Sequence, residues 1–197
     1  MGSNYQRNRT LVYIGLLAAQ GIIISLIENL IPSPLAFAPG AKLGFANLIT
    51  IIALFTLPVK YSFTVLMIRI IITALLGGTF STFLYSLLGG ILSYLAMLLV
   101  MQLGPKRVSI IGISVIGGVF HNMGQLLMAS LMAKSFSVMN YLPVMSISGI
   151  IAGFAVGVLG NYLLHNIATL RMYHESYSLS RKQNNWLNHD DDKKTDA

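Results

Sequence analysis

The sequence contains no cysteine and very few charged residues. The absence of cysteine excludes disulfides, thiolate metal sites and cysteine nucleophiles. Charged residues make up only 10% of the 197 residues, whereas an average soluble domain carries about 25%. Such a chain cannot cover a surface that faces water. The lipid bilayer is therefore the expected solvent for most of it.

Carboxylates are the scarcest charged groups. Only Glu28 and Glu175 precede the acidic run at residues 190–192, so the chain cannot supply the two carboxylate clusters that diphosphate–magnesium chemistry requires. The run itself is followed by Lys193 and Lys194 instead of completing a DDxxD pattern. We interpret it as a solvated charge run, and we expect no metal site.

Motifs of the common enzyme classes are also missing. The sequence has no phosphate-binding GxxxxGK[ST], no zinc-binding HExxH and no GxSxG nucleophile motif. It therefore carries no ATPase of its own. We expect no catalytic residues and no cofactor, and hence a protein that is not an enzyme.

Apolar residues dominate what is present. They make up 55% of the chain, and the mean hydropathy is +0.71. The net charge of +7 is compatible with nucleic-acid binding, but the cations are scattered and do not form the basic stripe of nucleic-acid binders. In membrane proteins, basic residues mark cytoplasmic loops. We therefore expect a lipid bilayer and no nucleic acid as partner.

Six apolar segments predict an all-α, polytopic membrane protein with six transmembrane helices. A short polar N-terminus, residues 1–10, precedes a membrane domain over residues 11–170, and a polar tail over residues 171–197 is expected to be disordered or to lie on the membrane surface. The second and third segments are short and leave open a re-entrant pair. The segments are residues 11–31, 43–57, 61–76, 79–103, 108–132 and 144–170.

The distribution of basic residues predicts the orientation. With the N-terminus inside, ten cations fall on the cytoplasmic side, and only Lys42 and Lys134 fall outside. This asymmetry follows the positive-inside rule. We expect both termini to be cytoplasmic and the protein to lie in a bacterial plasma membrane.

The first segment is expected to be a membrane helix and not a cleaved signal peptide. Its 21 residues exceed the usual 7–15-residue apolar core of a signal peptide. It also carries a flat side of small residues, Gly15, Ala18, Ala19 and Gly21, which permits close approach of another helix. In the sixth segment, Gly149, Gly153 and Gly157 recur every four residues and predict the same kind of packing.

Polar residues inside the membrane are concentrated in its middle and outer half. Glu28 lies about 25 Å along the first helix at 1.5 Å per residue, and Arg69 lies near mid-depth of the third segment. Such groups usually face a cavity or a partner. The residues of this group are Glu28, Lys42, Asn47, Arg69, Tyr85, His121, Asn122 and Gln125.

Their common depth predicts a polar pocket that opens outward and binds a small solute. Its cations favour an anion or a carbonyl-rich ring, and Tyr85 could stack on an aromatic ligand. Each member also has a structural explanation. Glu28 and Arg69 could neutralise one another, His121 and Asn122 could bridge helices, and Lys42 could reach the headgroups.

The order of motifs resembles one bacterial membrane family, known both as Gx transporter and as heptaprenyl diphosphate synthase component I. The resemblance covers roughly residues 11–165. It rests on PGAKLGFAN at residues 39–47, Arg69, GTF at 78–80, YSLLGG at 85–90, GISVIGG at 112–118 and HNMGQ at 121–125.

That family is similar to the substrate-binding S components of energy-coupling-factor vitamin transporters. The resemblance implies six helices, an outward-facing pocket, and a first helix whose small residues dock a transmembrane coupling protein that works with separate ATPase subunits. Gly15, Ala18 and Ala19 would form that docking face, although the usual AxxxA pattern is GxxxA here. The resemblance also implies an association with flavin-based extracellular electron transfer.

Three hypotheses follow. In the first, the chain is an S-component-like subunit that binds a small vitamin-like or anionic solute through its polar membrane residues. In the second, it is a non-catalytic membrane component of heptaprenyl diphosphate and menaquinone synthesis, whose cytoplasmic loops and tail carry the function. In the third, it is a structural membrane scaffold, for which neither set of residues matters.

Overall fold

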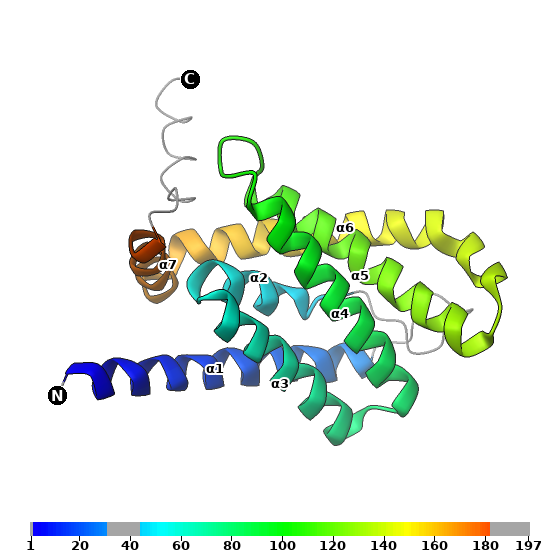
Figure 1. Cartoon of the computed structure of the whole chain (residues 1–197), viewed down its shortest axis with the longest axis horizontal. Helices are drawn as coiled ribbons and strands as arrows, with labels where there is room; N and C mark the ends of the chain where they lie inside the picture. Colours follow the sequence, from blue (N-terminus) through cyan, green and yellow to red (C-terminus); the bar gives the residue numbers. More distant parts are fainter. Residues whose placement is uncertain (1, 31–43, 182–197) are drawn as a thin grey trace.

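The computed structural model describes residues 2–30 and 44–181, which are almost entirely helical and contain no strand. The described elements are α1 (Gly2–Leu30), α2 (Asn47–Thr56), α3 (Val59–Gly77), α4 (Phe80–Met101), α5 (Ile110–Ala133), the short 3-10 helix η1 (Phe136–Tyr141), α6 (Leu142–Asn166) and α7 (Ala168–Arg181). Figure 1 shows α1 and α6 running along the length of the molecule, α3 and α4 inclined to them, and α7 at one end.

Five helices are long and apolar enough to cross a membrane: α1, α3, α4, α5 and α6 together with η1. Their outward faces carry large apolar side chains, among them Leu16, Leu75, Leu99 and Phe154, each more than half exposed. In water such a surface would be strongly unfavourable, whereas in lipid it is the expected surface. The chain is a membrane protein with an all-helical fold.

The second predicted segment forms only a half-length helix. The backbone turns at Gly44, whose φ is +90°, and α2 begins at Asn47 and ends before Pro58. Its 10 residues reach about 15 Å, half of the hydrocarbon thickness of about 30 Å. Five helices of spanning length are therefore described, compared with six predicted. Nine of the ten α2 residues are buried, so α2 fills the middle of the bundle.

The helices α4, α5 and α6 touch through their backbones. A methyl group added at Gly124 would lie 2.7 Å from the Cα of Gly89, and one added at Gly153 would lie 2.8 Å from the carbonyl oxygen of Ser114. At Gly118 it would overlap the carbonyl oxygen of Gly149. These contacts confirm the close packing predicted from the glycine spacing. They make α4, α5 and α6 one tightly joined unit.

The helices α1, α2 and α3 form a second unit, which packs through side chains. In α1, Gly21 lies against the aliphatic stem of Arg69 from α3, because a methyl group there would come within 2.9 Å of the Arg69 Cδ. Between the units, the hydroxyls of Ser62 on α3 and Tyr94 on α4 hydrogen-bond at 2.7 Å, and the Tyr94 hydroxyl donates to the carbonyl of Val59.

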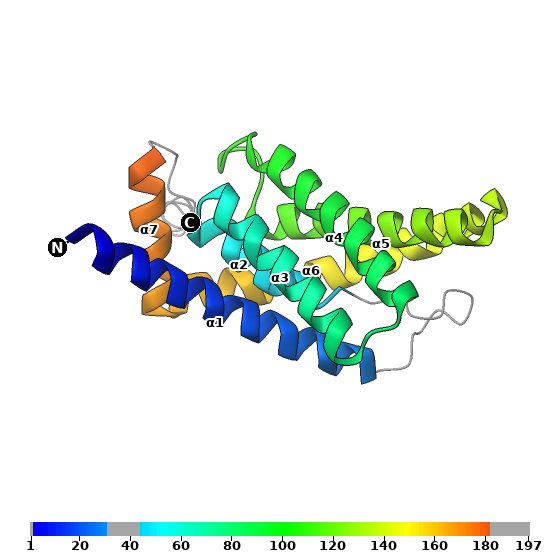
Figure 2. The same cartoon turned by 60° about the horizontal axis from the view of Figure 1, so that its bottom comes forward.

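The start of the polar tail is an ordered helix. His174 on α7 is 2% exposed, and its Nδ1 hydrogen-bonds to the Phe55 carbonyl at 2.7 Å. The ring of Tyr173 stacks on Tyr13 of α1 with centroids 4.1 Å apart, and the Arg9 guanidinium lies over Tyr173. The prediction of disorder is therefore wrong as far as Arg181. Figures 1 and 2 both place α7 beside the N-terminal end of α1.

A buried polar cavity between the two helix units

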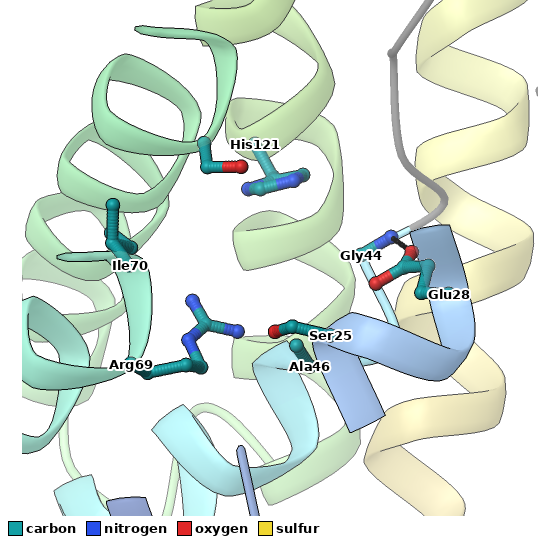
Figure 3. Close-up of a pocket in the computed structure, with 8 residues that line it drawn as sticks. Ser25, Glu28, Gly44, Ala46, Arg69, Ile70 and His121 are labelled. Carbon is teal, nitrogen blue, oxygen red and sulfur yellow. Dashed lines mark hydrogen bonds between the residues drawn. The ribbon is translucent and has the colours of Figure 1, made fainter. Parts of the chain in front are cut away.

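A small cavity lies where the two units meet. Residues from α1, the turn before α2, and α3 form one side, and residues from α4 and α5 form the other. Figure 3 shows the Glu28 carboxylate beside Gly44, the Arg69 side chain directed toward Ser25, and His121 on the opposite wall. The lining residues are Ser25, Glu28, Gly44, Ala46, Arg69, Ile70, Ser86 and His121.

The cavity is small in this conformation. The space open to the centre of a water-sized sphere is about 20 Å³, which is enough for about one water molecule. Any larger solute requires the lining helices or side chains to move apart. The structure therefore describes a closed form of the site.

Glu28 closes one side of the cavity near the end of α1. It is 6% exposed, and its Oε1 accepts hydrogen bonds from the backbone N–H groups of Gly44 and Phe45. The positive φ of Gly44 turns both N–H groups toward the carboxylate, an arrangement that suits a buried anion. The second oxygen, Oε2, is buried and has no hydrogen-bond partner.

Arg69 lies on α3 at the other side. It is 5% exposed, and its Nε is buried without a partner. Among the described residues the one ion pair is Arg171–Glu175, at 3.6 Å on the surface of α7. Glu28 and Arg69 therefore share a cavity without forming a direct ion pair, and their charges act on each other only across it.

Asn47 and His121 flank the turn at Gly44. A methyl group at Gly44 would lie 3.2 Å from both the Asn47 Nδ2 and the His121 Cδ2. Both atoms of the Asn47 amide are buried without a partner. His121 and Gln125 occupy one face of α5, as predicted from their spacing, and their Nε2 atoms lie 2.6 Å apart.

Three predicted site residues lie elsewhere. The Asn122 Nδ2 points at α6 and donates to the carbonyl of Met145 at 2.8 Å and to the Ser148 hydroxyl at 3.0 Å. This is a bridge between helices, the structural explanation that the sequence left open. Tyr85 is buried beside Ser86 on α4 but does not line the cavity. Lys42 lies outside the described residues.

Sequence reasoning missed Ser25 and Ser86, which line the cavity. Serine is common in membrane helices, so neither residue stands out by type. A signal was available for Ser25, which precedes Glu28 by three residues and therefore lies on the same face of α1. Ser86 has no such neighbour on α4. Its Oγ is buried without a partner.

The predicted docking residues do not share one face of α1. Gly15 has no atom within 4 Å of an added methyl group, and Ala19 is exposed. Ala18 is 3% exposed and belongs to the core. Gly21, the fourth residue of the predicted flat side, faces Arg69 in the interior. The prediction of one flat side is therefore wrong for Ala18 and Gly21, and the outward small residues are Gly15 and Ala19.

A second, larger groove lies at the opposite end of α1. Its volume is about 540 Å³, and it runs between α1, α2, α6 and the start of α7. Its walls are apolar except for the Tyr13 hydroxyl, which donates to Thr56, and the side chains of Gln20 and Thr169. The lining residues are Tyr13, Leu16, Leu17, Gln20, Ile23, Ile24, Leu48, Ile49, Ile52, Leu163, Ile167, Thr169 and Leu170.

Comparison with known proteins identifies the family. The model of one protein family, described as heptaprenyl diphosphate synthase component I, matches residues 17–163, about three quarters of the 197-residue chain. No curated protein and no solved structure matches the chain. The matched region begins within α1 and ends near the end of α6, so it contains the whole polar cavity. The chain thus belongs to the heptaprenyl diphosphate synthase component I family.

Proposed function

We propose that this chain is a membrane-embedded substrate-binding subunit, similar to an S component, that holds a small polar solute in the cavity between its two helix units. The observation that carries the proposal is the set of buried polar atoms around the cavity that have no protein partner. Glu28 Oε2, Arg69 Nε and Ser86 Oγ belong to residues that line the cavity, and both amide atoms of Asn47 lie next to the lining residue Gly44.

Unpaired polar groups inside a membrane protein are costly. Leaving one buried donor or acceptor unsatisfied costs about 1–3 kcal/mol, and more for a charged group. Five such atoms at one place would lower the stability by roughly 5 kcal/mol or more. Apolar residues at these positions would give a more stable helix bundle. Hydrogen bonds from these groups to a bound solute, or to water before the solute binds, would offset this cost.

The proposed topology has six membrane segments, with α2 as a half-length segment and both termini in the cytoplasm. The N-terminal end of α1 and α7 lie at one end of the bundle (Figure 1). When the N-terminus is placed in the cytoplasm, most basic residues of the chain fall on the cytoplasmic side. Glu28 lies near the other end of α1, so the solute would enter from outside.

Movement of the solute would need separate proteins, because the sequence has no nucleotide-binding motif. A transmembrane coupling protein with its own ATPase subunits would dock on the outer face of α1. That face carries Gly15 and Ala19 between the exposed side chains of Leu16 and Ile23.

The test is native mass spectrometry of the full chain, purified gently from its own membrane. We expect a small molecule to be retained by the native chain and to be lost from Arg69→Gln and Asn47→Ala. Matched controls at exposed sites, Arg107→Gln and Asn166→Ala, should retain it. Retention by all four variants, with their helical content unchanged, would show that the cavity is not the binding site.

A second candidate function is that of a non-catalytic membrane component of heptaprenyl diphosphate synthesis. The family description favours it, and so does the apolar groove, which could hold a prenyl chain. Arg9 lies near one end of this groove, since it covers Tyr173, which stacks on the groove residue Tyr13. A cation at that place suits a phosphorylated head group.

The two candidate functions should be impaired by different substitutions. If the second holds, narrowing the groove by Ile167→Trp should lower heptaprenyl diphosphate production by membranes that also contain the soluble synthase. Leu99→Trp, an exposed lipid-facing control on α4, should leave production unchanged, and so should Arg69→Gln. Loss of production in Arg69→Gln alone would favour the polar cavity instead.

A further inference from the structure

The polar cavity carries equal numbers of opposite charges. Among the described residues that line it, Glu28 and Arg69 are the two with a formal charge. Both are more than nine-tenths buried. The cavity wall as described therefore has a net charge of zero, which does not match the anionic solute expected from the sequence.

The two charges are held apart. The backbone N–H groups of Gly44 and Phe45 draw the Glu28 carboxylate toward the turn before α2. The Arg69 stem packs against Gly21, and Figure 3 shows its guanidinium directed toward Ser25. Opposite charges in a medium of low dielectric attract strongly. Their separation leaves room between them for a group that contacts both.

The buried polar atoms without a hydrogen-bond partner indicate which donors and acceptors a bound solute must have. Of the lining residues, Glu28 Oε2 can only accept hydrogen bonds, whereas Arg69 Nε can only donate them. Asn47, beside the lining residue Gly44, adds one acceptor and one donor without a partner. The Ser86 hydroxyl can do both. The cavity therefore requires donors and acceptors in about equal number. An anion would satisfy the donors and leave the acceptors facing a like charge, which is unfavourable at a buried site.

We infer that the solute is a compact dipolar molecule with no net charge, which places an acceptor at Arg69 and a donor at Glu28. This inference rests on the proposed function and names the class of its substrate. Two chemistries meet the description: a zwitterion with a carboxylate and an ammonium group, and an uncharged ring with adjacent C=O and N–H groups. The cavity volume of about 20 Å³ in the closed form must increase before a solute of either class can enter.

The test uses the full chain in detergent and measures the rise of its thermal unfolding midpoint with each probe. The zwitterion series consists of glycine, alanine and serine, with their N-acetyl derivatives as anions and their methyl esters as cations. Uracil and hydantoin represent the uncharged rings, with orotate as the anionic counterpart. We expect a rise of about 5 °C or more with a zwitterion or a ring at saturation. The charged counterparts should produce no rise.

Two variants test the charge argument directly. Glu28→Gln keeps an oxygen that can accept the N–H groups of Gly44 and Phe45, so the turn should survive, but the cavity then has a net positive charge. We expect its preference between the zwitterion and the N-acetyl anion to shift toward the anion by at least tenfold. Glu175→Gln on the surface of α7 is the matched control and should keep the native preference.

Two results would overturn the inference. One is a native chain that is stabilised as strongly by the anionic counterparts as by the dipolar probes, and the other is a native chain that no dipolar probe stabilises. Native mass spectrometry separates these results from a failure of the proposed function. A retained anion would contradict only the inference about its class, whereas the absence of any retained solute would contradict both.

Discussion

The two helix units of this protein are joined in different ways. In the unit of α4, α5 and α6, glycines bring the backbones into contact, as between Gly118 and Gly149. In the unit of α1, α2 and α3, side chains separate the backbones, as the Arg69 stem does at Gly21. Backbone contact cannot adjust to a change of even one methyl group, whereas a long side chain can rotate away.

The cavity lies between a rigid wall and an adjustable one. His121 and Ser86 belong to the glycine-packed unit, and Glu28 and Arg69 belong to the unit packed through side chains. The closed cavity must widen to admit any solute larger than water. If a solute enters the cavity, we expect α1 and α3 to move while α4, α5 and α6 keep their arrangement. The two units should therefore respond differently to equivalent substitutions.

The largest effect is expected in the rigid unit. Gly118→Ala on α5 would place a methyl group against the carbonyl of Gly149 and 3.1 Å from the Cα of Gly153. Because only backbone atoms surround it, α5 and α6 must separate. We expect a loss of stability of about 1–3 kcal/mol or more, measured as a lower unfolding midpoint in detergent.

Gly112→Ala on the same helix is the control. A methyl group there would meet side-chain atoms of Val108 and Ser109, at 3.2 and 3.5 Å, which can shift. Its effect on the midpoint should be small, since alanine is also favoured over glycine within helices. Equal losses in both variants would show that the backbone contact does not make this unit rigid.

A smaller effect on stability, but a clear effect on binding, is expected in the adjustable unit. Gly21→Ala would place a methyl group 2.9 Å from the Arg69 Cδ, and the guanidinium would then move within the cavity. The fold should survive, because the arginine stem is flexible. Solute affinity should fall by roughly tenfold, equivalent to about 1.4 kcal/mol, in a titration monitored by thermal unfolding.

Gly15→Ala on the same helix provides the comparison. No atom lies within 4 Å of a methyl group at this position, so both stability and solute affinity should stay near the native values. A loss of affinity in both variants would place the cause in α1 itself and not in the position of Arg69.

The sequence predicted the polar convergence because hydrocarbon makes each polar residue costly. In a soluble protein, Glu28 and Arg69 would be two unremarkable charges among many. In apolar segments each one indicates a partner or a cavity, and the structure places them in the same cavity together with His121. The position of each polar residue along its helix, which sets its depth in the membrane, was sufficient for this prediction.

Rotation of a helix about its axis was harder to predict. A membrane helix is apolar toward both lipid and core, so periodicity does not show which face points inward. Asn122 and Gln125 therefore looked alike, although Asn122 faces α6 and Gln125 lies beside His121. For the same reason Ala18 was grouped with Gly15. The sequence indicated that the second segment is short, but not that α2 is only 10 residues long, because its buried sides are as apolar as a full span.

The smallest effect is expected at Asn122, which tests where the site ends. Asn122→Ala removes two hydrogen bonds to α6, and such bonds between membrane helices are worth about 0.6 kcal/mol on average and up to about 1.7. The unfolding midpoint should fall slightly, and solute affinity should not change, because Asn122 does not line the cavity. Asn166→Ala at an exposed position of α6 is the matched control. If Asn122→Ala abolished binding while its unfolding midpoint stayed near that of the control, the site would extend beyond the cavity wall into the contact between α5 and α6. The rigid unit would then not be a fixed wall.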